Sequence, residues 1–291
     1  ALTTTQLGGL SSTQVSGLTA SAVAGITATQ AAMLTTTQLK GIASTQVAAL
    51  SSTAVNALTT TLVAALTTTQ LQGLTAAGMA ALTTTNLGSL SNDQLTALTT
   101  TQLSGLTGTG ISALSTTQLA VLSSTQVGGL STGAVIGLSS TQVAALTTTQ
   151  VTGLTQTQMG VLTSTAINAM TATQIGQLSV QQFGSLSSTG VNALISAHID
   201  QLTTSQIASL SNSGISGLTA TEVSGLTTTQ LLALTSTQIR ALTADELNGL
   251  TAGQLSGMTS TQAYYLQSTQ LSQVTATFID SLNATQWMAL S

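Results

Sequence analysis

Residues 3–10 read Thr-Thr-Thr-Gln-Leu-Gly-Gly-Leu, and residues 11–18 repeat the pattern as Ser-Ser-Thr-Gln-Val-Ser-Gly-Leu. Cutting the chain every eight residues from Thr3 gives 36 octads, which end at Leu290 without an insertion or a deletion. Positions five and eight of the octad are apolar in all 36. Because an internal repeat decides the whole architecture, the fold must be built from this octad.

The first and fourth positions of the octad indicate the start of a helix. Position one is Ser or Thr in 32 octads, and position four is Gln or Glu in 24. Ser/Thr-x-x-Gln/Glu before an apolar step is a capping box, in which the hydroxyl and the amide oxygen accept hydrogen bonds from main-chain N–H groups. The apolar pair at positions five and eight is also separated by a helical spacing.

A single continuous helix does not fit the repeat, because eight residues advance a helix by about 800° and the apolar stripe would drift by about 80° per octad. The pattern predicts one short helix per octad and then a bend near position seven, which is Gly, Ala or Ser in 29 octads. Helices this short need packing between octads to be stable. We therefore predict a repeat solenoid of short capped α-helices, with a β-solenoid as the alternative that the Thr and Val content leaves open.

A longer period appears at position four. When the octads are numbered from Thr3, the third and seventh of every seven never carry Gln there, whereas 22 of the other 26 do. The ten exceptional slots hold Ala22, Ala54, Gly78, Gly110, Ala134, Ala166, Gly190, Glu222, Glu246 and Phe278. Their mean separation is 3.5 octads, or 28 residues. Since a residue type that recurs once per coil marks one side of a solenoid, we predict about 28 residues per coil.

The small residues in these slots are candidates for an assembly surface. We define the small-residue seam as Ala22, Ala54, Gly78, Gly110, Ala134, Ala166 and Gly190. A small residue at a position where most octads carry Gln implies that a neighbouring part of the assembly comes too close to leave room for the long glutamine side chain. We expect the seam to form one axial stripe, covered by another subunit or by a sharp bend in the chain.

The composition excludes several classes of function. Charged residues are 3% of the chain, against about 25% in ordinary soluble domains. Lys40 and Arg240 are the only permanent cations, so we expect neither nucleic acid nor an anionic membrane surface as a partner. No apolar run approaches the roughly 18 residues that indicate a transmembrane segment. With 42% apolar residues and a net charge of −4, the chain is also unlike a disordered one.

No residues are arranged for catalysis or for binding a metal or cofactor. His198 is the only histidine, and it lies in the most irregular octad, 195–202. The one adjacent acidic pair, Asp245-Glu246, falls where a helix N-terminus is expected and where a carboxylate is favourable. The many hydroxyl groups lack a neighbouring base that could activate a nucleophile. We therefore predict a protein that is not an enzyme and has no cofactor.

The pattern predicts a single continuous array over residues 1–290, with a possible modified C-terminal cap at 259–291. Four of the chain's five aromatic residues lie in the last four octads: Tyr264, Tyr265, Phe278 and Trp287. Terminal repeats of solenoids cover the end of the core, and a docking patch is the alternative interpretation of this cluster.

The octads resemble the Thr/Ser/Gln-rich octapeptide tracts, of the type Leu-Thr-x-x-Gln-Ile-x-Ala-Leu, of very large secreted or surface-anchored bacterial proteins. Residues 138–146, Leu-Ser-Ser-Thr-Gln-Val-Ala-Ala-Leu, match this pattern, and the resemblance covers the entire chain. The resemblance implies an extracellular or cell-surface location and a fibrous or adhesin-like role. It carries no catalytic residues.

These observations favour a structural role. We expect a subunit or segment of an extracellular filament, sheath or stalk that self-associates, because a nearly uncharged surface offers little repulsion to association. Attachment to a surface would then use another region. The alternative is an ice-binding or surface-adhesion module, in which Thr at positions one and three forms regular arrays.

Overall fold

The structure is a computed structural model that describes residues 2–290. These residues form 35 short α-helices and one 3-10 helix, and no strand occurs among them. The prediction of a helical repeat is confirmed, and the β-solenoid alternative is not supported. Within the same residues, no helix is both long enough and apolar enough to cross a bilayer.

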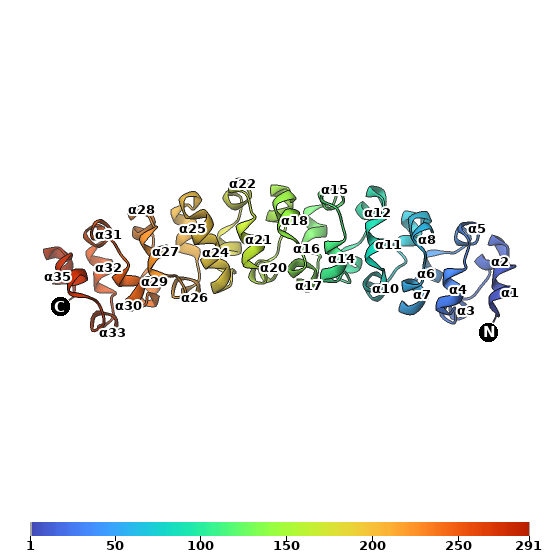
Figure 1. Ribbon diagram of the computed structural model, residues 1–291, viewed down its shortest axis with the longest axis horizontal. Coiled ribbons are helices and arrows are strands. Elements are labelled where there is room, and N and C mark those ends of the chain that lie inside the picture. Colours follow the sequence, from blue (N-terminus) through green and yellow to red (C-terminus); the bar gives the residue numbers. More distant parts are fainter. Residues whose placement is uncertain (1, 291) are drawn as a thin grey trace. The chain divides into compact units, whose positions relative to one another are not determined.

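The chain divides into two compact units, Ala1–Gly153 and Leu154–Ser291. In each unit the short helices follow one another as coiled ribbons joined by extended connections (Figure 1). The octad pattern runs across the boundary without a change, so the sequence alone predicted a single array.

The helices of the first unit are four to six residues long and start at intervals of eight residues. They are α1 Thr4–Gly8, α2 Ser12–Ser16, α3 Ala20–Ala24, α4 Ala28–Ala32, α5 Thr36–Leu39, α6 Ser44–Ala48, α7 Ser52–Asn56, α8 Thr60–Ala65, α9 Thr68–Leu71, α10 Ala76–Ala81, α11 Thr84–Gly88, α12 Asn92–Thr96, α13 Thr100–Leu103, α14 Gly108–Ser112, α15 Thr116–Ala120, α16 Ser124–Gly128, α17 Thr132–Ile136, α18 Ser140–Ala145 and α19 Thr148–Thr152.

The second unit continues the same spacing with one exception, the longer helix α24 and the 3-10 helix η1 that follows it. Its helices are α20 Gln156–Gly160, α21 Ser164–Asn168, α22 Ala172–Gly176, α23 Val180–Gly184, α24 Ser188–His198, η1 Ile199–Gln201, α25 Thr204–Ser209, α26 Asn212–Ile215, α27 Ala220–Ser224, α28 Thr228–Leu232, α29 Ser236–Ala241, α30 Ala244–Asn248, α31 Ala252–Gly257, α32 Ser260–Tyr264, α33 Ser268–Leu271, α34 Ala276–Asp280 and α35 Ala284–Ala289.

Capping boxes start the helices, as α9 illustrates. The Thr67 hydroxyl accepts from the N–H of Gln70 at 3.2 Å, and Gln70 Oε1 accepts from the N–H of Thr67 at 3.0 Å. Thr67 itself is extended, with φ −68° and ψ 158°, so the chain changes direction just before the helix. The same reciprocal pair occurs in both units, for example at Thr147 and Thr235.

The bend between helices needs no left-handed residue. At the end of α7, Ala57 is still in the helical region (φ −83°, ψ −7°), and no residue of the described part has a positive φ. The chain turns at position eight, where Leu66, for example, is extended with φ −61° and ψ 130°. A small residue at position seven is required for space at some octads: a Cβ built on Gly73 would lie 2.2 Å from the carbonyl oxygen of Ser44.

The core of each unit consists of the apolar residues at positions five and eight. Leu71 and Leu74 are 0% and 3% exposed, and Val143 and Leu146 are 2% and 6% exposed. Helices three octads apart in the chain pack on each other, as α7 does on α4 and α24 on α21. Burial of these side chains by other octads supplies the stability that such short helices lack by themselves.

Candidate functional site

The side chain of glutamine at position four links octads that are far apart in the sequence. While its oxygen caps its own helix, Gln70 Nε2 donates to the carbonyl oxygens of Leu39 at 2.6 Å and Ile42 at 2.7 Å. In the second unit, Gln238 Nε2 donates to Ile207 at 3.0 Å and Leu210 at 2.8 Å. These acceptors belong to positions five and eight of the fourth octad back, 31 and 28 residues earlier. Some of the glutamines also donate to position six of that octad, as Gln238 does to Ala208 at 3.3 Å.

The capping box accounts for only half of this arrangement. A Glu at position four caps a helix as well as Gln does, as Glu222 shows by accepting from the N–H of Thr219 at 2.7 Å. Only Gln also offers N–H donors, which the carbonyl groups of the earlier octad require when they are buried. The near-exclusive use of Gln over Glu was therefore the signal for this second set of hydrogen bonds.

Six residues of the small-residue seam are buried within the chain itself. Ala54 and Ala134 are 0% exposed, Ala166 is 2% exposed, and Gly78, Gly110 and Gly190 are buried. A Cβ built on Gly110 would lie 3.0 Å from Leu87 Cδ1, and one built on Gly190 would lie 3.0 Å from Ile167 Cδ1. For these two glycines the close object is a core side chain three octads back, and for Gly78 it is Leu74 of the preceding octad, where we had expected another subunit or a sharp bend.

Ala22 differs from the other six residues of the seam because it is exposed. It belongs to the third octad, and the helix that should cover it would come before Thr3. Its exposure supports the explanation that the preceding repeat buries the rest of the seam. The remaining members lie on helices that pack in pairs within each unit, such as Gly110 on α14 and Ala134 on α17.

Asparagine at position six adds a forward link in the same octads. Asn56 Nδ2 donates to the carbonyl oxygen of Ala81 at 2.9 Å, and Asn192 Nδ2 donates to that of Gly217 at 2.6 Å. Both acceptors lie 25 residues later, in the third octad ahead. The octads that lack a bridging glutamine are therefore held to the next coil by closer packing and, at these positions, by an asparagine.

The irregular octad 195–202 lacks both the capping hydroxyl and the capping glutamine, whereas Ala43 and Gln267 replace only the hydroxyl and a regular helix still starts after them. Ile195 occupies position one, and helix α24 runs through it to His198 before the chain forms η1. His198 is 7% exposed, and its Nε2 lies 3.3 Å from the carbonyl oxygen of Ile167, 31 residues earlier. The imidazole thus takes the place of the glutamine amide, which gives this lone histidine a structural explanation.

Glu246 is a carboxylate in a glutamine-like environment. It is 1% exposed, and Oε2 accepts from the N–H of Thr243, while the buried Oε1 has no hydrogen-bond partner. Burial raises the pKa of Glu246 above its ordinary value, hydrogen bonds from Thr243 and Leu218 oppose this, and the charge of Asp245 raises the pKa further. A protonated carboxyl group therefore fits this slot better than a carboxylate.

The last octads, 259–290, keep the same short helices and expose some of their apolar side chains. Trp287 is 47% exposed, Met288 is 69% exposed and Tyr264 is 65% exposed, whereas Phe278 is 2% exposed. The Arg240 guanidinium lies 5.1 Å from the centre of the Tyr265 ring. Of the aromatic residues, Phe278 fills the core, and Trp287 leaves much of its surface open to solvent.

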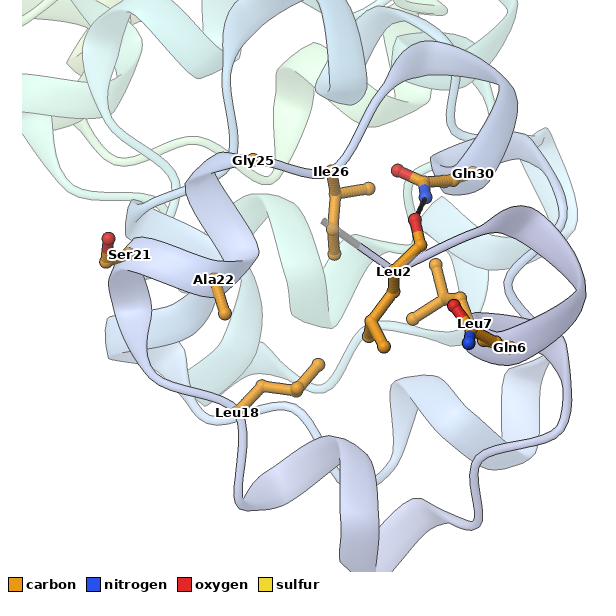
Figure 2. Close-up of a pocket in the computed structure, with 9 residues that line it drawn as sticks. All are labelled: Leu2, Gln6, Leu7, Leu18, Ser21, Ala22, Gly25, Ile26 and Gln30. Atoms are coloured by element: carbon orange, nitrogen blue, oxygen red, sulfur yellow. Dashed lines mark hydrogen bonds between the residues drawn. The ribbon is translucent and has the colours of Figure 1, made fainter.

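The N-terminal end of the first unit contains a hollow of about 680 Å³. The side chains of Leu2, Leu18, Ala22 and Ile26 turn toward it (Figure 2). Gln30 closes one edge, because its Nε2 donates to the carbonyl oxygen of Leu2 at 2.6 Å. The lining is apolar with a few amide and hydroxyl groups, and it consists of core residues that no earlier octad covers.

Among residues 2–290, no three or more His, Asp or Glu side chains gather as they would to hold a metal ion. The chain matches no protein-family model and no curated protein.

Proposed function

We propose that the chain is a solenoid with about 28 residues per coil and one capped helix per octad. The observation that carries this proposal is the set of glutamine hydrogen bonds, which in both units join octads to main-chain carbonyl groups 28 to 31 residues earlier. In a solenoid each repeat contacts mainly its neighbours along the stack, so the same hydrogen bond to the preceding coil is expected to recur at a fixed separation.

We further propose that this solenoid is a non-enzymatic structural protein, a subunit or segment of an extracellular filament, sheath or stalk built by self-association. The hydroxyl and amide side chains at positions one and four already make hydrogen bonds within the repeat: position-one hydroxyls cap helices, and position-four amides bridge coils. The chain has only two cations and six acidic residues among 291, and one of the six, Glu246, is buried, so electrostatic repulsion between copies is small.

The test is assembly of the full chain in dilute salt. Sedimentation velocity over a range of protein concentrations, followed by electron microscopy, should show concentration-dependent polymers of a constant width. A single monomeric species at every concentration would contradict the proposed role. Location at the cell surface is tested separately, by immunolabelling of intact cells of the source organism.

An ice-binding or surface-adhesion module is the second candidate. It is favoured by the exposed hydroxyl groups at position three, such as those of Thr69, Thr101 and Thr149. Position-one hydroxyls contribute less to such an array, because they accept from the main chain at the helix start. Inhibition of ice recrystallisation by the monomeric protein would support this candidate over the filament.

A further inference from the structure

An open hollow of about 310 Å³ lies between α21, α24 and α27 in the second unit. Helix α24 packs on both α21 and α27, so the hollow is bounded by repeats on both sides. Its polar lining consists of Ser164, Asn168, Thr189, Asn192, Ser196 and Glu222. Every one of these side chains carries an oxygen atom, and only Glu222 carries a charge.

The amide oxygen of Asn192 has no hydrogen-bond donor. Asn192 Nδ2 donates to the carbonyl oxygen of Gly217 at 2.6 Å, which fixes the orientation of the amide. Asn192 Oδ1 is buried and has no hydrogen-bond partner among residues 2–290. Because a buried acceptor without a partner costs free energy, this oxygen calls for a ligand that the protein itself does not supply.

A second asparagine at position six shows which partner Asn192 lacks. Asn248 Oδ1 accepts from the N–H of Thr275, 27 residues later, at 2.8 Å. The equivalent N–H for Asn192 is that of Thr219, and Glu222 Oε2 already accepts from it at 2.7 Å. Two side-chain oxygens, one of them charged, therefore compete for one N–H group.

The rest of the lining adds further oxygen atoms. The hydroxyl of Ser164 donates to the carbonyl oxygen of Thr189 at 3.5 Å, so the lone pairs of its own oxygen stay free. Asn168 and Ser196 are exposed, so their oxygens are open to a ligand. Since Oε2 of Glu222 caps α27, Oε1 is left as the second carboxylate oxygen.

We propose that this hollow binds a calcium ion, with Glu222 and Oδ1 of Asn192 as ligands and with the Asn168 amide oxygen, hydroxyl groups and water completing the coordination. The site combines one carboxylate with neutral oxygens and so differs from a cluster of acidic side chains. It goes beyond the structural role proposed above and does not depend on self-association.

Calcium fits this set of oxygens better than other ligands do. It accepts carboxylate, amide, hydroxyl and water oxygens in a flexible geometry, whereas magnesium demands a near-ideal octahedron. It also approaches oxygen to about 2.4 Å, closer than a water molecule does, which suits a buried oxygen such as Asn192 Oδ1. With a single carboxylate we expect a dissociation constant of about 1 mM, as in weak extracellular calcium sites.

The first test is Glu222→Gln, which removes the charge and keeps the helix. Glutamine at position four forms the same capping box, as Gln70 does with Thr67. Isothermal titration of the full chain with CaCl2 at constant ionic strength should show calcium affinity lowered about 10-fold or more. The helical circular dichroism should stay at the wild-type value. An unchanged affinity in this folded variant would overturn the proposal.

Asn192→Asp should act in the opposite direction. Without calcium, the new carboxylate repels that of Glu222 and loses the hydrogen bond to Gly217, so the thermal midpoint should fall. With calcium, the second charged ligand should raise the affinity about 10-fold and restore the midpoint. If Oδ1 of Asn192 instead needs only a hydrogen-bond donor, calcium will not rescue this variant, and the proposal fails.

The matched control is Asp93→Asn, which removes one exposed carboxylate from α12 in the first unit. Its calcium titration should equal that of the wild type, and MgCl2 should bind the wild type more weakly than CaCl2 does. An equal loss of calcium affinity in Asp93→Asn and Glu222→Gln would show a diffuse ion atmosphere and refute a defined site. If Asn192→Asp does not fold, Asn192→Ala takes its place, and calcium affinity equal to the wild type in that variant refutes the role of Oδ1.

Discussion

The first three octads and the interior octads have the same sequence pattern and the same capped helices, but they differ in what covers them. Gln14 accepts from the N–H of Ser11 at 2.9 Å, and Gln94 accepts from the N–H of Ser91 at 2.9 Å. Yet Gln14 is exposed, while Gln94 is 4% exposed and donates to the carbonyl group of Leu66 at 2.8 Å.

This difference shows that two separate layers of interaction hold the protein together. The helix cap forms between residues three apart in the chain, so it is complete even in the first octads, where no earlier coil covers the helix. The bridging hydrogen bonds and the close packing need an earlier coil. In a stack of this kind, stability is approximately the sum of weak repeats and strong interfaces between neighbours. Matched substitutions at the two places should therefore have very different effects.

The largest difference is expected for Ala134→Gln compared with Ala22→Gln. Ala134 is 0% exposed, so a glutamine there must displace the packed core, at a cost of about 3 kcal/mol in the free energy of unfolding. Ala22 is exposed and should accept the same side chain without loss. Urea unfolding of both variants, below the concentration of association, measures the two values. Equal stabilities would contradict the assignment of the seam to packing within the chain.

Glycine at position seven gives the next comparison. A Cβ on Gly73 would lie 2.2 Å from the Ser44 carbonyl oxygen, whereas one on Gly9 would meet nothing closer than the Thr5 carbonyl oxygen at 3.6 Å. We expect Gly73→Ala to lower the free energy of unfolding by about 2 kcal/mol through main-chain displacement. Gly9→Ala at the C-cap of α1 should be neutral or slightly stabilising. Amide hydrogen exchange near each site would report the local effect.

Removal of the bridge itself should cost slightly less. Gln94→Ala leaves the buried carbonyl groups of Val63 and Leu66 without their donor, which should lower the free energy of unfolding by about 1.5 kcal/mol. Gln14→Ala removes only the exposed half of a capping box, worth about 0.5 kcal/mol or less. A cost at Gln94 no larger than that at Gln14 would show that the long-range hydrogen bonds contribute nothing.

The smallest effect is expected for Glu246, which occupies a buried position four where most octads carry Gln and which has no N–H group to donate. Because its pKa is raised in the folded state, the folded protein holds this proton more tightly than the unfolded chain does. The resulting stabilisation is present below the pKa of 4.5 that a glutamate has in an unfolded chain, and it is lost as the pH rises through the higher pKa of the folded state.

Glu246→Gln should remove this pH dependence and raise the free energy of unfolding at neutral pH by about 1 kcal/mol. Urea midpoints of the two proteins between pH 4 and pH 8 test this. Parallel curves for wild type and variant would argue against a perturbed carboxyl group at this position.

The helices and their starts were predictable from the sequence because they depend on neighbours in the chain. Thr67 and Gln70 are three residues apart, so a capping box can be recognised without any tertiary information. In octad 195–202 Ile195 replaces the hydroxyl and His198 replaces the glutamine, so no capping box forms and α24 continues. Where only the hydroxyl is missing, at Ala43, Gln46 still accepts from the N–H of Ala43 and a helix starts.

Some features could be located in the sequence but not explained by it. The period of 28 residues at position four was visible, and it coincides with the separation of Gln38 Nε2 from its acceptor on Leu10. What approaches the small residues was not visible, because Gly110 and Leu87 meet only when helices three octads apart pack together. The pattern also ran unchanged through the boundary between the two units at Gly153, which the sequence did not mark.

The sequence by itself determined the octad, the capped helix and the positions of the core, because each follows from hydrogen bonds and apolar spacing within eight residues. Only the tertiary structure decided which faces are covered. Gln14 and Gln94 both stand at position four, three residues after a capping serine, and one is exposed while the other is buried. The physical reason is that burial depends on whether another coil lies against the residue, and that neighbour comes from about 28 residues away in the chain.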